Sequence, residues 1–191
     1  MKTEKPIILA ITGASGAVYG LRMLEALKKL GISVHLIFSP MGGQILEKET
    51  GIPPEALKQK ANRWYHPGDL SAPIASGSFP TQGMLVVPCS VKTLSGIANS
   101  YTENLIQRAA DVCLKEGRPL LLAVRETPFH AGHLGLMSQA STAGAIIFPP
   151  IPAFYHQPKT IDDLVNVTVG RMLARIGIEN NFYQIWGSSS G

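Results

Sequence analysis

The chain has 191 residues, of which 45% are hydrophobic and 16% are charged, and its formal net charge is +4. This length fits a single domain, and no apolar run reaches the roughly 18–20 residues of a membrane span. The absence of a Lys/Arg block argues against a nucleic-acid-binding protein. Because Cys89 and Cys113 are too few for a disulfide scaffold and the N-terminus lacks a signal-peptide pattern, we expect a cytoplasmic protein.

Apolar runs of two kinds alternate along the chain. Continuous, branched runs predict buried strands at residues 6–13, 33–38, 84–87, 119–124 and 145–148. Apolar residues at helical spacing predict helices at residues 16–29, 41–50, 54–62, 91–99, 104–116 and 134–143. A last helix is expected to begin with a capping box of Thr160 and Asp163 and to end at Gly177. The rest of residues 51–82 is expected to be loop.

This alternation of strands and helices predicts the fold class. It favours an α/β protein with a parallel sheet between two layers of helices. We expect one domain over residues 1–186 and a disordered tail at residues 187–191.

Ligands of open parallel sheets bind beyond the carboxyl ends of the strands, so the residues that follow each predicted strand bear on function. At these positions the sequence has glycines, hydroxyl groups and one charged pair, namely Gly13, Ala14, Ser15, Gly16, Ser39, Cys89, Ser90, Arg125 and Glu126, and the loop at residues 149–158. A polar rim on apolar strands suits an anionic ligand. Cys89, after a buried strand, is interpreted as a packed thiol rather than a nucleophile.

Residues 12–20 read TGASGAVYG. Glycines between a strand and a helix let backbone N–H groups approach a phosphate, whose negative charge the helix N-terminus favours. Ser15 can add a hydroxyl donor. The alternative is a tight turn that only packs the helix closely on the strand, and the spacing is neither the Walker pattern nor GxGxxG.

The same turn is similar to that of extended short-chain dehydrogenases, and Tyr155 and Lys159 make a YxxxK motif. Two features oppose a dehydrogenase. Pro158 lies inside YxxxK, where it disfavours the regular helix that would hold both side chains. The second strand ends at Ser39 and Pro40, without an acid for a ribose or an arginine for a 2′-phosphate. The pattern therefore favours a nucleotide with one phosphate and no adenosine, such as FMN.

Several charged residues have both a functional and a structural interpretation. Arg125 can hold a phosphate or a flavin carbonyl, and Glu126 can position it or handle protons. The alternative for these two residues is a surface ion pair. Arg108, Asp111 and Lys115 share one helix face, and such a face is usually solvated.

Other candidate residues also have both a functional and a structural interpretation. Arg171 borders an apolar stripe and Tyr155 lies in a proline-rich loop, so each belongs to a pocket or only packs against its neighbours. Glu49 is interpreted by default as a surface acid at a helix end. His130 and His133 form HxxH, but their neighbours do not suggest a metal-binding helix, so no metal is expected.

Taken in chain order, the motifs resemble those of the flavin prenyltransferases of the UbiX type. They read TGASGAVYG, LEKET, PCSVKTLSGIA, NLIQRAADVCLKEGRPLLLAVRETP and PPIPAFYHQPKTIDDLV, and the likeness spans residues 7–186. The combination of PCS-x-K-T, RE-T-P and AFYH-x-P is specific. The resemblance implies a Rossmann-like, flavodoxin-type sandwich that assembles as a homododecamer with active sites between subunits. It also implies reduced FMN and dimethylallyl monophosphate as ligands.

The resemblance further implies roles for individual residues. FMN contacts would fall on Gly13, Ala14, Ser15, Ser39, Ser90, Val91, Lys92, Thr93 and Arg125. The prenyl phosphate would be held by Lys115, Glu126, Tyr155 and Arg171, with Arg108 and Glu49 near the same pocket. The candidate catalytic residues are Glu49, Lys115, Glu126, Tyr155 and Arg171.

The chemistry that the resemblance implies joins the allylic C1 to flavin N5 and then closes a ring from flavin C6. Lys115, Arg171 and Tyr155 would stabilise the departing phosphate, and Glu126 or Glu49 would assist removal of the C6 proton. The product, prenylated FMN, would serve UbiD-type decarboxylases in ubiquinone biosynthesis or aromatic acid decarboxylation. Two other functions stay open: a flavin-dependent decarboxylase of the cysteine-decarboxylase type and a non-catalytic FMN-binding subunit.

Overall fold

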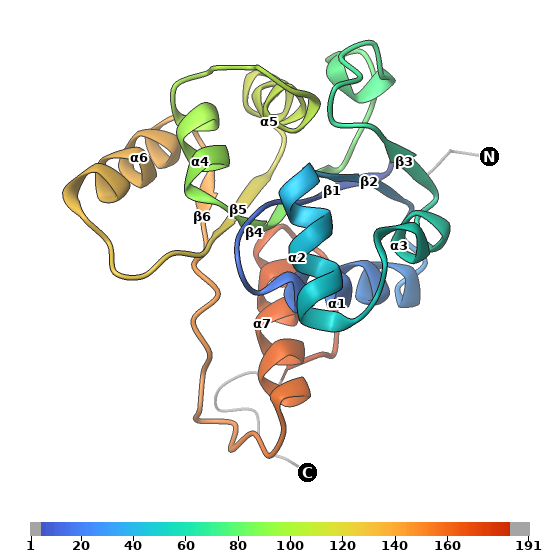
Figure 1. Cartoon of the computed structure of the whole chain (residues 1–191), viewed down its shortest axis with the longest axis vertical. Helices are drawn as coiled ribbons and strands as arrows, with labels where there is room; N and C mark the ends of the chain where they lie inside the picture. Colours follow the sequence, from blue (N-terminus) through green and yellow to red (C-terminus); the bar gives the residue numbers. More distant parts are fainter. Residues whose placement is uncertain (1–4, 184–191) are drawn as a thin grey trace.

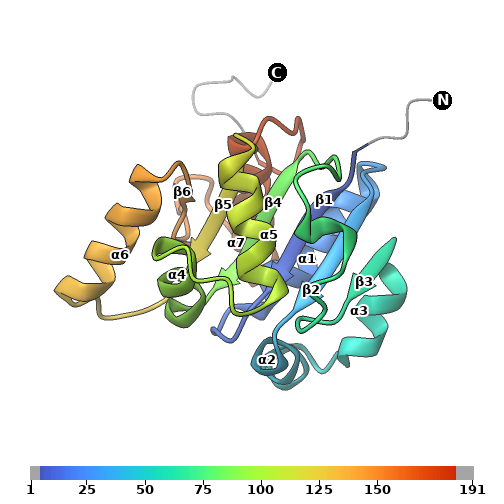
Figure 2. The same cartoon turned by 90° about the horizontal axis from the view of Figure 1, so that it is seen from above.

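The computed structural model describes residues 5–183 and contains one parallel sheet with helices on both faces (Figure 1, Figure 2). Its strands are β1 (Ile7–Ile11), β2 (Val34–Phe38), β3 (Arg63–Tyr65), β4 (Gly83–Cys89), β5 (Leu120–Val124) and β6 (Ile146–Ile147). They stand in the order β3-β2-β1-β4-β5-β6, and each neighbouring pair is parallel. The tail expected at residues 187–191 lies outside the described residues.

The helices form two layers. α1 (Ala17–Lys29) and α7 (Ile161–Arg175) cover one face, and α4 (Val91–Ala98), α5 (Leu105–Lys115) and α6 (Ala131–Thr142) cover the other. α2 (Pro40–Thr50) and α3 (Pro54–Lys60) flank the sheet near β2 and β3 (Figure 2). The predicted α/β sandwich of three layers is confirmed. Between residues 5 and 183, every helix is too short or too polar to cross a membrane.

The centre of the core is β1, whose five residues are all buried. Ile7, Leu9 and Ile11 pack in the cluster that includes α1 and α7, whereas Ile8 and Ala10 pack in the cluster that includes α4 and α5. A parallel strand between two helix layers must be apolar on both sides, which explains the continuous run in the sequence. Each fully buried isoleucine or leucine side chain stabilises the fold by about 1.5–3 kcal/mol relative to an exposed one.

The predicted strands and helices agree with the structure except for boundary residues and one missed strand. β3 and the 3₁₀ turn η1 (Pro73–Ala75) lie in the segment that was expected to be loop. The three residues of β3 change from exposed to buried and form no apolar run, which is why the sequence did not predict this strand. The described sheet therefore has six strands, one more than expected. α6 begins at Ala131 rather than at residue 134, because the His130 side chain caps it by accepting from the Gly132 N–H.

Two glycines let helices approach the ends of the neighbouring strands β4 and β1 closely. A Cβ added at Gly20 of α1 would lie 2.5 Å from the carbonyl oxygen of Val87. A Cβ added at Gly42 of α2 would overlap the carbonyl oxygen of Ile11. Only glycine fits at both positions, so α1 and α2 pack directly against the strand backbone.

Gly20→Ala is expected to destabilise the fold by about 1–3 kcal/mol, because the added methyl group forces α1 away from β4. Gly135 of α6 is the matched control, since a Cβ there would meet no atom within 4 Å. Gly135→Ala should leave the stability unchanged or raise it by up to about 1 kcal/mol through helix propensity. Urea unfolding measures both variants, and equal stabilities would contradict the close packing at Gly20.

Candidate functional site

The chain changes direction across the sheet between β1 and β4. After β1 it continues outward through β2 and β3, and after β4 it continues the other way through β5 and β6. Open α/β sheets bind ligands at such a switch point, beyond the carboxyl ends of the strands. β2, β1 and β4 are neighbours, so the N-termini of α2, α1 and α4 lie along this edge (Figure 2). Three positive helix ends favour an anion there.

Serine side chains cap two of these three helices. The Ser39 hydroxyl oxygen accepts a hydrogen bond from the Gly42 N–H at 3.0 Å. The Ser90 hydroxyl oxygen accepts from the Thr93 N–H at 3.3 Å and donates to Thr93 Oγ1 at 3.1 Å. Both serines are partly buried at their helix ends. The Ser39 hydroxyl keeps its proton for a ligand, because its oxygen acts as the acceptor in the cap.

The third helix, α1, is capped by a residue of α2. Glu49 Oε2 accepts from the Gly16 N–H at 3.0 Å and from the Ala17 N–H at 2.8 Å. Gly16 is the N-cap residue, with a φ of +94°, and it has no side chain that could cap the helix. Glu49 is thus an exposed acid at a helix end, as expected, but it also fills the N-terminus of a second helix. The start of α1 already holds a carboxylate, which the sequence did not indicate.

The turn between β1 and α1 is tight. The Ala14 N–H donates to the Thr12 carbonyl oxygen at 2.8 Å, and a Cβ added at Gly13 would lie 2.7 Å from Met41 Cγ. Within residues 5–183, Ser15 makes no hydrogen bond through its N–H or its hydroxyl, so both donors are open to a ligand. We call the predicted cofactor contacts at this edge the cradle; they are Gly13, Ala14, Ser15, Ser39, Ser90, Val91, Lys92, Thr93 and Arg125.

Arg125 follows β5 and lies next to the turn after β4, because its N–H donates to the Cys89 carbonyl oxygen at 3.1 Å. Its side chain is exposed, and the described residues show no ion pair between it and Glu126. Glu126 Oε1 instead accepts from the Thr127 N–H at 2.9 Å. The described residues therefore do not form the surface ion pair, and the role of Arg125 in cofactor binding stays a prediction.

Arg108 and Lys115 lie at opposite ends of α5. Arg108 Nε donates to the Ala75 carbonyl oxygen at 3.0 Å, and its Nη1 pairs with Asp111 at 2.9 Å. Lys115 Nζ pairs with Glu116, close to where β5 begins. Because α5 runs opposite to the strands, Lys115 lies at the amino ends of the strands and the cradle lies at their carboxyl ends (Figure 2).

Tyr155 and Arg171 belong to the part of the chain that follows β6. Residues 148–160 form an extended strap that leaves the sheet (Figure 1). On this strap the Tyr155 ring packs on His156, with ring centroids 3.9 Å apart. Arg171 is exposed on α7, in the layer opposite α5. Lys115 and Arg171 therefore lie on opposite sides of the sheet, and one chain does not bring them together.

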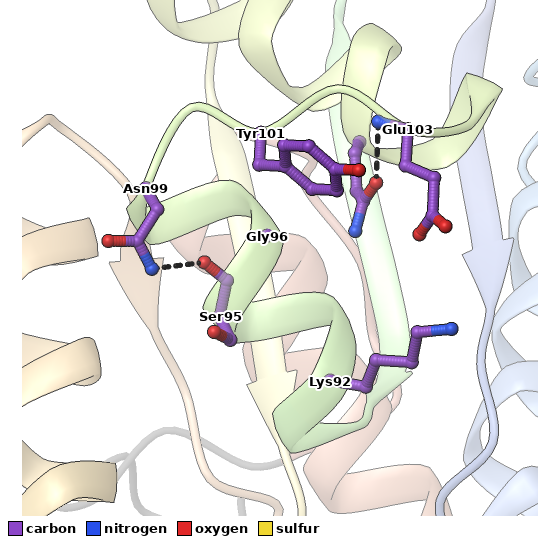
Figure 3. Close-up of a pocket in the computed structure, with 7 residues that line it drawn as sticks. Lys92, Ser95, Gly96, Asn99, Tyr101 and Glu103 are labelled. Carbon is purple, nitrogen blue, oxygen red and sulfur yellow. Dashed lines mark hydrogen bonds between the residues drawn. The ribbon is translucent and has the colours of Figure 1, made fainter.

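A hollow of about 530 Å³ adjoins the cradle along α4 (Figure 3). It is lined by Lys92, Ser95, Gly96, Asn99, Tyr101, Glu103 and Gln107. Gln107 is 3% exposed, and its Oε1 accepts from the Glu103 N–H at 3.0 Å. Lys92 belongs to the first turn of α4, and its ammonium group has no ion-pair partner in the described chain. The hollow thus shares Lys92 with the cradle, and this residue brings a positive charge without an ion-pair partner in the described chain.

Within residues 5–183, His130 and Cys89 each have the surroundings of a structural residue. His130 Nδ1 accepts from the Gly132 N–H at 3.0 Å, so the neutral ring carries its proton on Nε2 and has no lone pair left for a metal. Among residues 5–183, no group of three His, Cys, Asp or Glu side chains could hold a metal ion. Burial raises the pKa of the Cys89 thiol far above its ordinary value, which agrees with a packed thiol.

The sequence interpretation did not single out Thr12, which is 1% exposed between the turns that follow β1 and β4. Its hydroxyl donates to the Pro88 carbonyl oxygen and accepts from the Ser90 N–H, both at 2.8 Å. The sequence feature that could have identified Thr12 is a hydroxyl residue at the end of a continuous apolar run, directly before the glycine turn. A buried hydroxyl needs hydrogen-bond partners, and the neighbouring turn supplies them.

Comparisons with known proteins agree on one family. The Flavoprotein family model matches residues 1–172. Flavin prenyltransferase UbiX of Salmonella typhimurium is 51% identical over 175 residues, which cover 91% of this chain and 93% of that protein. The chain belongs to the UbiX-type flavin prenyltransferases. The prenyltransferase activity expected from the motifs is thereby confirmed.

Solved structures of two relatives resemble this flavin prenyltransferase closely. AnUbiX (PadA1), in complex with FMN and dimethylallyl pyrophosphate, is 41% identical, with a TM-score of 0.95 over 97% of this chain and 99% of that chain. A dodecameric FMN-dependent UbiX-like decarboxylase from Escherichia coli O157:H7 is also 41% identical, with a TM-score of 0.93 over 96% of this chain and 100% of that chain. The sheet and helix layers described above are therefore those of the family.

Glu49→Ala is expected to destabilise the flavin prenyltransferase by about 1 kcal/mol, because two N–H groups at the start of α1 lose their acceptor and the helix dipole loses a nearby negative charge. Glu47→Ala is the control, since Glu47 is an exposed acid on the same helix whose side chain makes no hydrogen bond in the described residues. Chemical denaturation compares the two variants. The same small loss in both would show that the Glu49 cap does not form in solution.

Proposed function

We propose that the enzyme transfers the dimethylallyl group of dimethylallyl monophosphate to reduced FMN, with new bonds at flavin N5 and C6. The observation that carries the proposal is the cradle at the switch point of the sheet, in a chain that belongs to a family of flavin prenyltransferases. The complex of AnUbiX with FMN and dimethylallyl pyrophosphate supports the pairing of a flavin with an allylic phosphate. The prenylated FMN serves UbiD-type decarboxylases in the cytoplasm.

The cradle fits a mononucleotide with one phosphate. The proposal puts the FMN phosphate over the N-termini of α2 and α4, where Ser39 and Ser90 are the N-cap residues and Lys92 lies in the first turn of α4. Arg125 follows β5 beside this edge, because its N–H donates to the Cys89 carbonyl oxygen. The N-terminus of α1 is less suitable for a dianion, because the Glu49 carboxylate already accepts its N–H groups and like charges repel. Residues 13–15 then border the remainder of the cofactor.

The side chains proposed to bind the prenyl phosphate lie far apart within one chain. Lys115 lies at the amino ends of the strands, and Arg171 lies in the opposite helix layer. The strap that carries Tyr155 also exposes Ile151 at 76% and Phe154 at 68%, which gives a second subunit an apolar surface to cover. We therefore propose active sites between the subunits of a homododecamer, the assembly of the Escherichia coli relative.

Transfer of the allyl group separates charge. As C1 leaves the phosphate and bonds to flavin N5, positive charge develops on the allyl group and negative charge on the phosphate. Lys115, Arg171 and the Tyr155 hydroxyl stabilise that phosphate, and Arg108 borders the same pocket from α5. Holding the two reactants in line removes an entropic barrier of up to roughly 7–11 kcal/mol.

Ring closure joins flavin C6 to C3 of the prenyl group. The C2=C3 double bond breaks, C2 takes up a proton from the released phosphate, and C6 releases a proton that a carboxylate must accept. Glu126 follows Arg125 at the cradle, and its Oε2 has no hydrogen-bond donor within residues 5–183. Glu49 Oε2, in contrast, is occupied by two backbone N–H groups. The proposal therefore assigns the C6 proton to Glu126 and gives Glu49 a structural place beside the flavin.

Anaerobic incubation of the enzyme with reduced FMN and dimethylallyl monophosphate is expected to add one C5 unit to the flavin, which mass spectrometry detects. A parallel reaction with the diphosphate tests the phosphorylation state of the donor. Oxidised FMN is the control, because its N5 is not a nucleophile. Flavin of unchanged mass with both donors would overturn the proposed function.

Mixed oligomers test whether subunits share the active site. Lys115→Ala and Arg125→Ala should each reduce prenylation strongly. If separate subunits supply these two side chains, co-expression of the variants in equal amounts should create sites with both native residues, about one quarter of the total for random assembly. The measurement is turnover of the purified mixed oligomer relative to the wild type.

The matched control is a mixture of Arg125→Ala with Glu126→Gln. These residues are adjacent in the chain, so every site in that mixture lacks one of them and no activity should return. A Lys115→Ala and Arg125→Ala mixture that is as inactive as this control would refute the shared site.

A further inference from the structure

The hydrogen-bonded ladder between β1 and β4 stops before the strands reach the cradle. Its register pairs Ile7 with Gly83 and ends at the pairing of Ala10 with Val86. Pro88, further along β4, has no N–H group, so it cannot continue the ladder. A different contact must therefore hold the two turns that follow these strands at a constant spacing.

Thr12 makes that contact with three hydrogen bonds. Its N–H donates to the Pro88 carbonyl oxygen at 3.2 Å, and its hydroxyl donates to the same oxygen at 2.8 Å. Thr12 Oγ1 also accepts from the Ser90 N–H at 2.8 Å. The hydroxyl is donor and acceptor at once, which determines its rotation. Because Thr12 is 1% exposed, bulk water has little access to replace these partners.

The two segments that Thr12 joins both belong to the cradle. Thr12 directly precedes Gly13 in the turn to α1, and its partner Ser90 is the N-cap residue of α4. We propose that Thr12 is a positioning residue for flavin binding, whose buried hydroxyl sets the spacing between the glycine turn and the N-terminus of α4. This role rests on the proposed function, because it requires the flavin to contact both segments.

Valine is the informative replacement, since it has the shape of threonine with a methyl group in place of the hydroxyl. In Thr12→Val the Ser90 N–H loses its partner, and a single backbone hydrogen bond to Pro88 remains between the turns. Thr12→Ser keeps the hydroxyl and should restore the contact. Thr168 supplies a matched control, because it is 3% exposed and its hydroxyl donates to the Leu164 carbonyl oxygen inside α7.

Titration with FMN, followed by flavin fluorescence, measures the Kd of each variant, and urea unfolding measures its stability. We expect Thr12→Val to raise the Kd about tenfold, equivalent to about 1.4 kcal/mol, and Thr12→Ser to stay within about threefold of the wild type. Thr168→Val should lose stability and still bind FMN as tightly as the wild type. A purely structural role of Thr12 predicts instead that both valine variants change the Kd in the same way.

The outcomes separate this role from the proposed function. If the wild type binds FMN and Thr12→Val binds it equally well, the positioning role is refuted and the proposed function stands. If the wild type binds no FMN, the proposed function fails and the role of Thr12 fails with it. If Thr12→Val does not fold, Thr12→Ala replaces it, and the same increase in Kd is expected because alanine also lacks the hydroxyl.

Discussion

The close approach of two helices to strand backbone, α2 to the end of β1 and α1 to the end of β4, is the constraint on which the rest of the structure depends. Gly20 and Gly42 leave no space for a Cβ, so α1 and α2 pack directly on strand carbonyl groups. This packing brings the end of α2 near the start of α1, where Glu49 reaches the Gly16 N–H. A larger residue at either glycine would push its helix away from the strand backbone and disturb the candidate cofactor site at the same time.

The sequence predicted the central strands well because their environment leaves a simple pattern. β1 and β5 are buried on both faces, and a strand with two buried faces is a continuous apolar run. β3 has no such pattern, because it pairs only with β2 at the edge of the sheet, and tertiary pairing rather than composition defines it. The polar residues at strand ends were predictable for a related reason, since parallel strands end at one edge and their following residues must converge.

Contacts between residues far apart in the chain were not predictable in the same way. The carboxylate of Glu49 caps a helix that begins 32 residues earlier in the sequence, at Ala17, and no local pattern encodes that meeting. Helical spacing correctly placed Arg108 and Lys115 on one helix. A period of 3.6 residues shows which residues share a face of that helix, but it does not show which edge of the sheet each residue lies near. Seven residues along a helix correspond to about 10 Å, yet both side chains reach one segment, because Arg108 Nε donates to the Ala75 carbonyl oxygen and Lys115 Nζ lies beside Gly77.

The Glu49 carboxylate also makes the two ends of the proposed site electrostatically different, so it favours one orientation of the bound flavin. Its negative charge lies at the start of α1, while the side chains of Lys92 and Arg125 supply positive charge on the side of α4 and β5. A flavin bound with its phosphate toward α2 and α4 meets hydroxyl groups and cations. The reversed flavin would put its phosphate against a carboxylate that two N–H groups hold in place, and such repulsion selects one orientation as effectively as an added attraction. One side chain can therefore stabilise a helix and determine how the proposed cofactor binds.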